Sequence, residues 1–124
     1  MPSEAAQVKM RSMLNRCLYV ALRATRDARR LEELLEAHLQ WAIAAERRGE
    51  LFASGPFVAN GASPGAAGGM SIVRASSEAD ARNILAEDPF VAQGAVEIEV
   101  RRWLLMEGGF TVTVRLSSQT SRFT

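Results

Sequence analysis

The chain has one cysteine and one histidine among its 124 residues, and both scarcities exclude functions. Cys17 has no partner for an intramolecular disulfide, so we expect a cysteine packed in the core of a reduced, cytoplasmic protein. One histidine and one cysteine are too few for a zinc site, so no metal and no other cofactor is expected. No apolar run reaches about 18 residues and no signal-peptide pattern is present, so we expect no membrane partner.

The chain also lacks an excess of positive or negative charge. The 15 basic and 14 acidic residues leave a formal charge of +1, which predicts neither a nucleic-acid partner nor attraction to a membrane surface. Apart from Lys9, every basic residue is arginine. Arginine suits the recognition of planar anions, but we interpret this bias as genomic base composition.

Length and composition fit one domain. With 48% hydrophobic residues, the chain can bury one ordinary core. We expect a flexible lead-in over residues 1–14, a folded domain over residues 15–118, and a tail over residues 119–124.

The first predicted elements are a strand and a helix. Residues 15–24, NRCLYVALRA, are rich in apolar and β-favouring side chains, which indicates a central strand. Apolar side chains then recur every three or four residues over residues 31–45, which predicts an amphipathic helix. Gly49 is its C-cap candidate.

A second helix is predicted from its capping signals. Ser76 or Ser77 opens it, and Ser77 and Asp80 stand at capping-box spacing. Asp88 and Pro89 end it, because the residue before a proline is pushed out of the α region. The remaining segments are a short apolar stretch at 51–54, a loop at 59–69, a strand at 70–75, a turn to Gly94 and a strand at 95–105.

The C-terminal segment predicts a hairpin. Residues 107–109 form a turn candidate between the strand at 95–105 and a second strand at 110–116. Phe110, Val112 and Val114 share one parity of that second strand, so we expect one buried face and one wet face. Residues 117–124 are predicted as a polar tail.

This order of elements predicts an α+β fold, a ferredoxin-like βαββαβ sandwich with a C-terminal hairpin extension. Two helices cover one face of such a sheet. The strands carry apolar residues at both parities, with Leu18 and Val20 against Tyr19 and Leu22. We therefore expect the second face to be buried in a homodimer or higher homo-oligomer.

His38 is the candidate for chemistry. It lies on the apolar face of the first helix, where a core histidine satisfied by one hydrogen bond is the structural alternative. The two helices of a ferredoxin-like layer run roughly antiparallel, which should bring Asp88 near His38. A carboxylate beside an imidazole fixes its tautomer, as a general base requires, whereas an ordinary Asp-Pro turn is the alternative for Asp88.

A pocket is expected beside this pair. Gly55, Pro56 and Phe57 form a bend before a loop of small residues, which suits a ligand pocket or merely a long connection. We predict that they contact a substrate together with Trp41 and Phe90, although a tryptophan at this spacing is more often a core or dimer contact. No phosphate-binding glycine fingerprint is present.

These residues together resemble the YciI-like (YCII) family over residues 17–103. The matching pieces are CLYVALRA, the helix segment with His38-Leu39, the stretch ERRGELFASGPF, and Asp88-Pro89-Phe90-Val91 followed by Gly94. The resemblance implies a dimeric α+β barrel and a small enzyme of the kind found among lactone isomerases and dehydrochlorinases. It also implies a conserved active-site histidine and aspartate, which fall on His38 and Asp88. The segment after Gly49, poorer in acidic residues, and the C-terminal hairpin depart from the family pattern.

Two functions follow as hypotheses. The first is a cofactor-free isomerase, lyase or dehydrochlorinase in which His38, oriented by Asp88, moves a proton on a small cyclic or aromatic-derived substrate. The second is a non-catalytic dimeric protein that binds a small molecule or serves as an accessory factor. A catalytic His38 should face a cavity or a carboxylate, whereas a structural one should be sealed by backbone partners.

Overall fold

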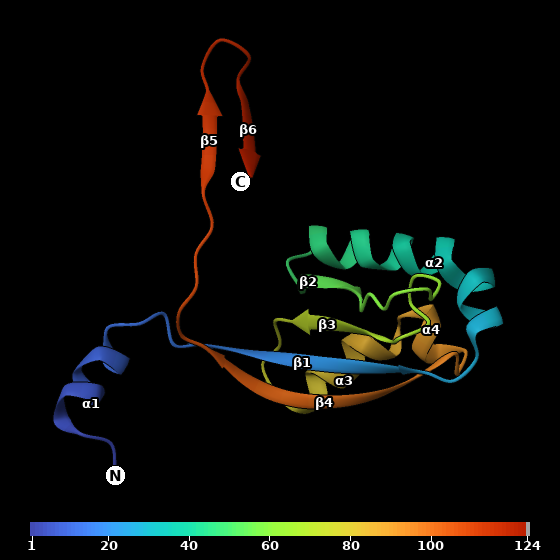
Figure 1. Ribbon diagram of the computed structural model, residues 1–124, viewed down its shortest axis with the longest axis horizontal. Helices are drawn as coiled ribbons and strands as arrows, with labels where there is room; N and C mark the ends of the chain where they lie inside the picture. The colour runs from blue at the N-terminus through green and yellow to red at the C-terminus, as the bar shows by residue number, and fades with distance from the viewer. Residues whose placement is uncertain (124) are drawn as a thin grey trace. The chain divides into compact units, whose positions relative to one another are not determined.

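A computed structural model describes residues 1–123 of the protein. The chain divides into two compact units. Residues 17–104 form the main unit, and residues 1–16 together with those from 105 onward form the other. The four-stranded sheet lies in the main unit (Figure 1).

The main unit has a four-stranded sheet in the order β2-β3-β1-β4, as a ferredoxin-like fold requires. Strand β3 pairs antiparallel with both β1 and β2. The described strands leave this sheet open, so no closed barrel forms within the chain. Its elements in chain order are β1 Arg16–Thr25, α2 Ala28–Arg47, β2 Leu51–Pro56, β3 Gly69–Val73, α3 Glu78–Ala86, α4 Pro89–Ala92 and β4 Val96–Leu105.

Helices α2 and α3 pack on the same face of this sheet. Trp41 and Ala45 of α2 and Leu85 of α3 share one core with Tyr19 of β1 and Val73 of β3. Tyr19 and Val73 are directly opposite each other in the β1-β3 ladder, so they project from one face. The predicted α+β sandwich is therefore confirmed.

The predicted helix ends have recognisable caps. Asp27 accepts hydrogen bonds from the first backbone N–H groups of α2, and Gly49 follows that helix at φ +80°, which glycine adopts without strain. The Ser77 side chain caps α3 by accepting from the Asp80 N–H at 3.0 Å. The Asp80 carboxylate in turn accepts from the Ser76 N–H, one residue before the expected partner.

One helix was not foreseen. Residues 89–92 form the single turn α4, where the sequence predicted only a turn. Pro89 occupies the first turn, where its missing N–H costs nothing, and Asp88 caps it by accepting from the Phe90 N–H at 3.0 Å. Helix α3 ends at Ala86 with Glu87 as its C-cap, so the Asp88 carboxylate begins α4 directly after it.

The second unit corrects the predicted hairpin. Strand β5, Val112–Arg115, pairs with β6, Thr120–Phe123, and not with β4. The turn therefore lies at residues 116–119, where Gln119 has a positive φ of 53°. Strand β6 forms although it is mostly polar, because pairing between backbones needs no apolar side chains. Residues 107–109 belong to no strand. Residue 124, the last of the expected tail, lies outside the described residues.

The expected burial of one hairpin face is also wrong for the single chain. Phe110, Val112 and Val114 are 76%, 46% and 64% exposed. Phe110 packs edge-on against Phe123 at 5.5 Å between ring centroids. A helix, α1 Glu4–Arg11, occupies most of the expected lead-in and begins at the capping Ser3.

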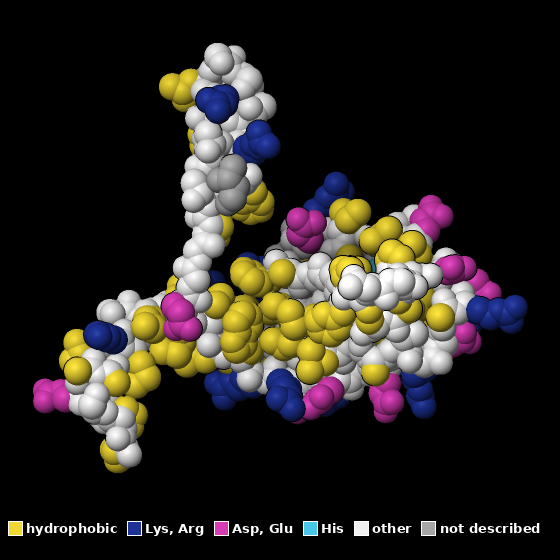
Figure 2. All heavy atoms as spheres, viewed as in Figure 1, with side chains coloured by type: hydrophobic (Ala, Val, Ile, Leu, Met, Phe, Trp, Pro, Cys, Tyr) yellow, Lys and Arg dark blue, Asp and Glu magenta, His cyan; other side chains and the backbone are white. Residues whose placement is uncertain are grey.

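The sheet face opposite the helices is apolar in its middle. Its register places Val20 opposite Ile72 and Leu22 opposite Met70, all pointing away from the core. Figure 2 shows hydrophobic side chains gathered over the strands of the main unit. We call Val20, Leu22, Met70 and Ile72 the open-face patch.

Candidate active site

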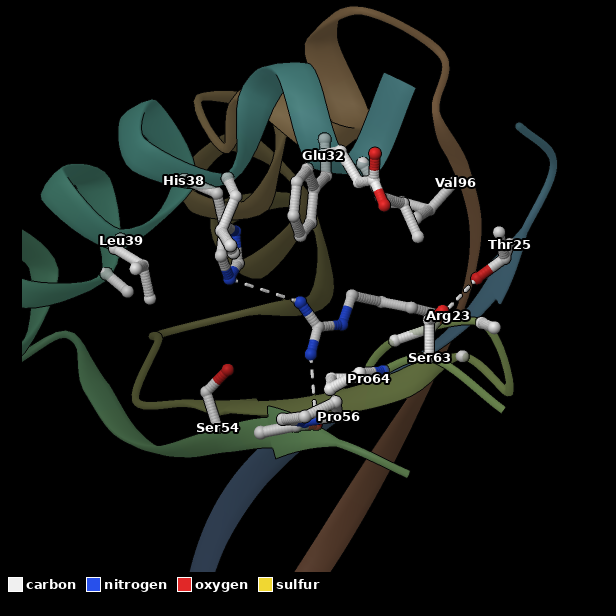
Figure 3. Close-up of a pocket in the computed structure, with 18 of the residues that line it drawn as sticks. Arg23, Thr25, Glu32, His38, Leu39, Ser54, Pro56, Ser63, Pro64 and Val96 are labelled. Carbon is white, nitrogen blue, oxygen red and sulfur yellow. Dashed lines mark hydrogen bonds between the residues drawn. The ribbon is translucent and has the colours of Figure 1, made fainter. Parts of the chain in front are cut away.

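The candidate site is a cavity of about 670 Å³ between α2, the end of β2 and the loop that precedes β3. Figure 3 shows Arg23 of β1 reaching between His38 on one side and Pro56 on the other. Most of the wall is apolar. Its lining includes Leu31, Leu35, Leu39, Ala42, Ile43, Phe52, Pro64, Phe90 and Val96.

His38 and Asp88 form a buried pair. The His38 Nδ1 lies 2.8 Å from Asp88 Oδ1, and the two residues are only 6% and 1% exposed. A carboxylate is an acceptor, and it already accepts from the Phe90 N–H, so Nδ1 carries the proton and donates it. The Nε2 atom is left with a lone pair, which is the state that a general base requires.

Aromatic packing fixes the plane of the imidazole. The Phe90 ring stacks on His38 at 4.0 Å between centroids with only 6° between the planes. Trp41 lies 6.0 Å away at 35°. Because Asp88 caps the short helix that holds Phe90, one residue sets both the hydrogen bond and the stacking surface.

Arg23 is the residue of this site that sequence reasoning missed. It is 7% exposed, its Nη1 lies 3.4 Å from His38 Nε2, and its Nη2 donates to the Gly55 carbonyl at 2.9 Å. Burial lowers the pKa of the guanidinium from its ordinary value, and the charge of Asp88 opposes that change. The available signal was an arginine at the core-facing parity of an apolar strand, two residues after Ala21.

Two glycines leave the space that Arg23 occupies. A Cβ on Gly69 would overlap the Arg23 Nη2 atom and lie 2.8 Å from the Gly55 carbonyl oxygen. A Cβ on Gly68 would overlap the Arg23 carbonyl oxygen, and its φ of +85° also favours glycine. Gly68 therefore leaves room for the backbone of Arg23, and Gly69 for its guanidinium.

The structure brings together part of the predicted set. His38, Gly55, Pro56 and Phe90 line the cavity. Asp88 does not line the cavity itself, but it is hydrogen-bonded to His38, which does.

Two predicted substrate contacts lie elsewhere. Trp41 is buried in the core cluster, and Phe57 is 42% exposed with its backbone N–H bonded to Gly68. Neither is part of the cavity lining. Thr25 and Ser54, which were not predicted, do line it.

Two other kinds of feature are absent from residues 1–123. No three histidine, cysteine or carboxylate side chains gather closely enough there to hold a metal ion. None of the helices in that range combines the length and the apolar character needed to cross a membrane.

Comparisons with known proteins agree with this fold. No curated protein matches the chain. Among solved structures, it is similar to 5-chloro-2-hydroxyhydroquinone dehydrochlorinase (TftG) from Burkholderia phenoliruptrix AC1100 in complex with 2,5-dihydroxybenzoquinone, at TM-score 0.58 and 22% identity. The match covers 69% of this chain and 92% of that one, and at this identity it supports the fold alone. The YCII-related domain matches residues 17–104, nearly the whole main unit, and the chain therefore belongs to the YCII-related domain family.

Proposed function

We propose that this chain is a cofactor-free enzyme that uses His38, oriented by Asp88, to move a proton on a small cyclic substrate. The observation that carries the proposal is the buried 2.8 Å hydrogen bond between the two side chains, with the imidazole on the wall of a cavity. Neither ring nitrogen of His38 bonds to backbone among the described residues. A structural histidine would instead have its ring nitrogens bonded to backbone groups.

The proposed reaction begins with a proton on a carbon or oxygen of the substrate. It passes to the lone pair of His38 Nε2, and the electron pair of the broken bond moves into the ring toward a carbonyl oxygen. Asp88 carries the opposite charge beside the imidazolium that forms. Return of the proton to another ring atom gives isomerisation. If a neighbouring carbon carries chloride, the pair held toward the oxygen instead forms a new double bond to that carbon, and the C–Cl bond breaks. Chloride leaves with the electrons of that bond, and the proton passes from His38 to water, so that HCl is lost overall.

The cavity supports a substrate of one ring. Its volume of about 670 Å³ lies within the range typical of small-molecule sites. The similar dehydrochlorinase was solved with 2,5-dihydroxybenzoquinone, a molecule of one ring.

A second function has an observation of its own. Arg23 Nη1 lies against the Nε2 atom that would act as the base. In a non-catalytic dimeric protein that binds a small molecule, this contact would be a fixed part of the binding wall, and His38 would only orient the arginine. That protein would bind a ligand without turning it over.

We also propose that the protein works as a homodimer through the open-face patch. Ile72 is already buried in the single chain, with 7% of its surface exposed, whereas Val20, Leu22 and Met70 are only partly buried. A face-to-face dimer would remove them from water, and stable interfaces commonly bury more than about 1,200 Å².

Chloride release from 5-chloro-2-hydroxyhydroquinone, with isomerisation of cyclic lactones as the parallel assay, tests the enzyme proposal. We expect His38→Gln to lower turnover by about 10²- to 10⁴-fold, the range for general bases. Glu99→Gln, on an exposed carboxylate of β4, is the control and should leave turnover unchanged. A folded His38→Gln protein with full turnover would end the proposal. Ligand binding without turnover in the wild type would favour the binding protein.

A further inference from the structure

We propose that Arg23 is the substrate-recognition residue of this site and that the substrate is anionic, with a carboxylate or an ionised ring oxygen on a small apolar ring. This inference rests on the proposed function, because it names the substrate class of the same cavity. It goes beyond the His38–Asp88 pair, which by itself requires no charge on the substrate.

The guanidinium of Arg23 has unused donors. It carries five N–H groups, and the structure gives it two contacts, one of them the long 3.4 Å approach to His38. Its Nε is buried without a hydrogen-bond partner among residues 1–123. An arginine held only for structure would normally have these donors satisfied, because a buried unpaired donor is costly.

The charge of Arg23 also lacks a direct counter-ion. No carboxylate of the described residues lies within ion-pair distance of it, and Asp88 acts on it only from behind His38. A buried positive charge of this kind is normally paired. An anion in the cavity would supply both the missing charge and the acceptors for the planar fork.

The placement of Arg23 links binding to proton transfer. Its positive charge lies against His38 Nε2, so protonation of that nitrogen would set two like charges side by side. A bound anion would offset the guanidinium and draw its N–H groups away from Nε2. The base would therefore become free only when the correct substrate is present.

Other charges around the cavity do not replace this role. Glu32 and Glu46 also line it from α2, but both are exposed to water. Water and salt screen these carboxylates strongly, whereas the buried guanidinium acts in a low-dielectric environment. The two carboxylates would therefore repel a bound anion less strongly than the guanidinium of Arg23 attracts it.

Calorimetric binding of matched charged and neutral ligands tests this inference. Benzoate against benzamide tests a carboxylate, and 2,5-dihydroxybenzoquinone against its dimethyl ether tests an ionised ring oxygen. We expect at least one anion to bind about ten- to one-hundred-fold more tightly than its neutral partner. The pair that shows the preference identifies the anionic group.

Two variants assign the preference to Arg23. Arg23→Gln should abolish it, and Arg23→Lys should keep part of it, because lysine retains the charge without the fork. Gly69→Ala should reduce it with Arg23 intact, since the added Cβ would displace the guanidinium. Melting temperatures show whether each variant is folded.

The outcomes separate this inference from the proposed function. A wild type with no preference for either anion, or a folded Arg23→Gln protein that keeps the preference, overturns the inference. His38→Gln should lose turnover yet keep the anion preference. Loss of the preference in His38→Gln but not in Arg23→Gln would assign the anion to the histidine and also overturn the inference. Full turnover in His38→Gln would instead overturn the proposed function and leave the Arg23 result valid. If both Arg23 variants fail to fold, the wild-type comparison and Gly69→Ala decide.

Discussion

The two faces of the sheet differ in where they place charge. The helix-covered face buries Arg23, His38 and Asp88 in one connected chain of contacts. The open face carries the apolar open-face patch in the middle and leaves its charges on β4, where Glu97 and Glu99 are exposed. Burial of three ionisable groups is costly and needs a reason, whereas an apolar patch needs only a cover. We infer chemistry on the first face and association on the second.

The largest expected effect is on the covered face. Asp88→Asn should lower turnover by about 10²-fold or more, because an amide no longer holds the Nδ1–H tautomer or balances the imidazolium. Asparagine also caps helices well, so α4 should persist and the melting temperature should change little. Steady-state kinetics measures the turnover of Asp88→Asn, with Glu99→Gln as the control. Unchanged turnover in Asp88→Asn would remove Asp88 from the mechanism.

The open face should respond in association instead. Val20→Glu places a charge in the proposed dimer interface and should yield a monomer at micromolar concentration, whereas the β-branched control Val20→Thr should remain dimeric. Light scattering distinguishes the two states. A wild-type monomer, or a dimeric Val20→Glu protein, would contradict this assignment of the faces.

Truncation after Glu107 should have a smaller effect, confined to association. The hairpin of β5 and β6 pairs with itself, so its loss breaks no strand pairing of the main sheet. Its exposed apolar residues should nevertheless contribute to dimer affinity or solubility, with a loss of about ten-fold expected. Analytical ultracentrifugation measures this change. An unchanged dimer affinity, solubility and melting temperature would leave the hairpin without a role in assembly.

The smallest effect is expected for Trp41→Phe. Trp41 packs in the core beside His38, and its buried Nε1 has no hydrogen-bond partner among residues 1–123, so phenylalanine loses only volume. We expect a loss of about 1 kcal/mol of stability with ligand affinity unchanged. Thermal unfolding and calorimetry measure the two quantities. A selective loss of affinity would restore Trp41 as a substrate contact.

Much of the fold could be predicted because its signals are local. The apolar, β-favouring run of β1, the period of α2, and the caps at Gly49 and Ser77 each depend on neighbours within a few residues. The pairing of β5 with β6 could not be predicted from alternation, because the partner of a strand depends on where the chain turns. Gly108 and Gly109 indicated a turn at residues 107–109, whereas the observed turn at 116–119 contains no glycine, and the polar sequence TSRF of β6 indicated a tail.

The site was predictable only where topology sufficed. The antiparallel arrangement of two helices was enough to bring His38 and Asp88 together. Arg23 escaped because a charged side chain near a strand end is ordinarily exposed, and its burial depends on two glycines more than 40 residues later. Because the abundance of arginine was interpreted as genomic composition, the buried arginine beside His38 was not singled out.

The most direct test uses the fact that the chain has a single histidine, so its imidazole signals need no assignment. Nitrogen-15 NMR of the ring should show a proton on Nδ1 and a lone pair on Nε2, and the Nε2 signal should change when an anion displaces Arg23. Our account predicts this tautomer in the wild type and its loss in Asp88→Asn. A proton on Nε2 in the neutral wild-type ring would contradict the connected Arg23–His38–Asp88 site.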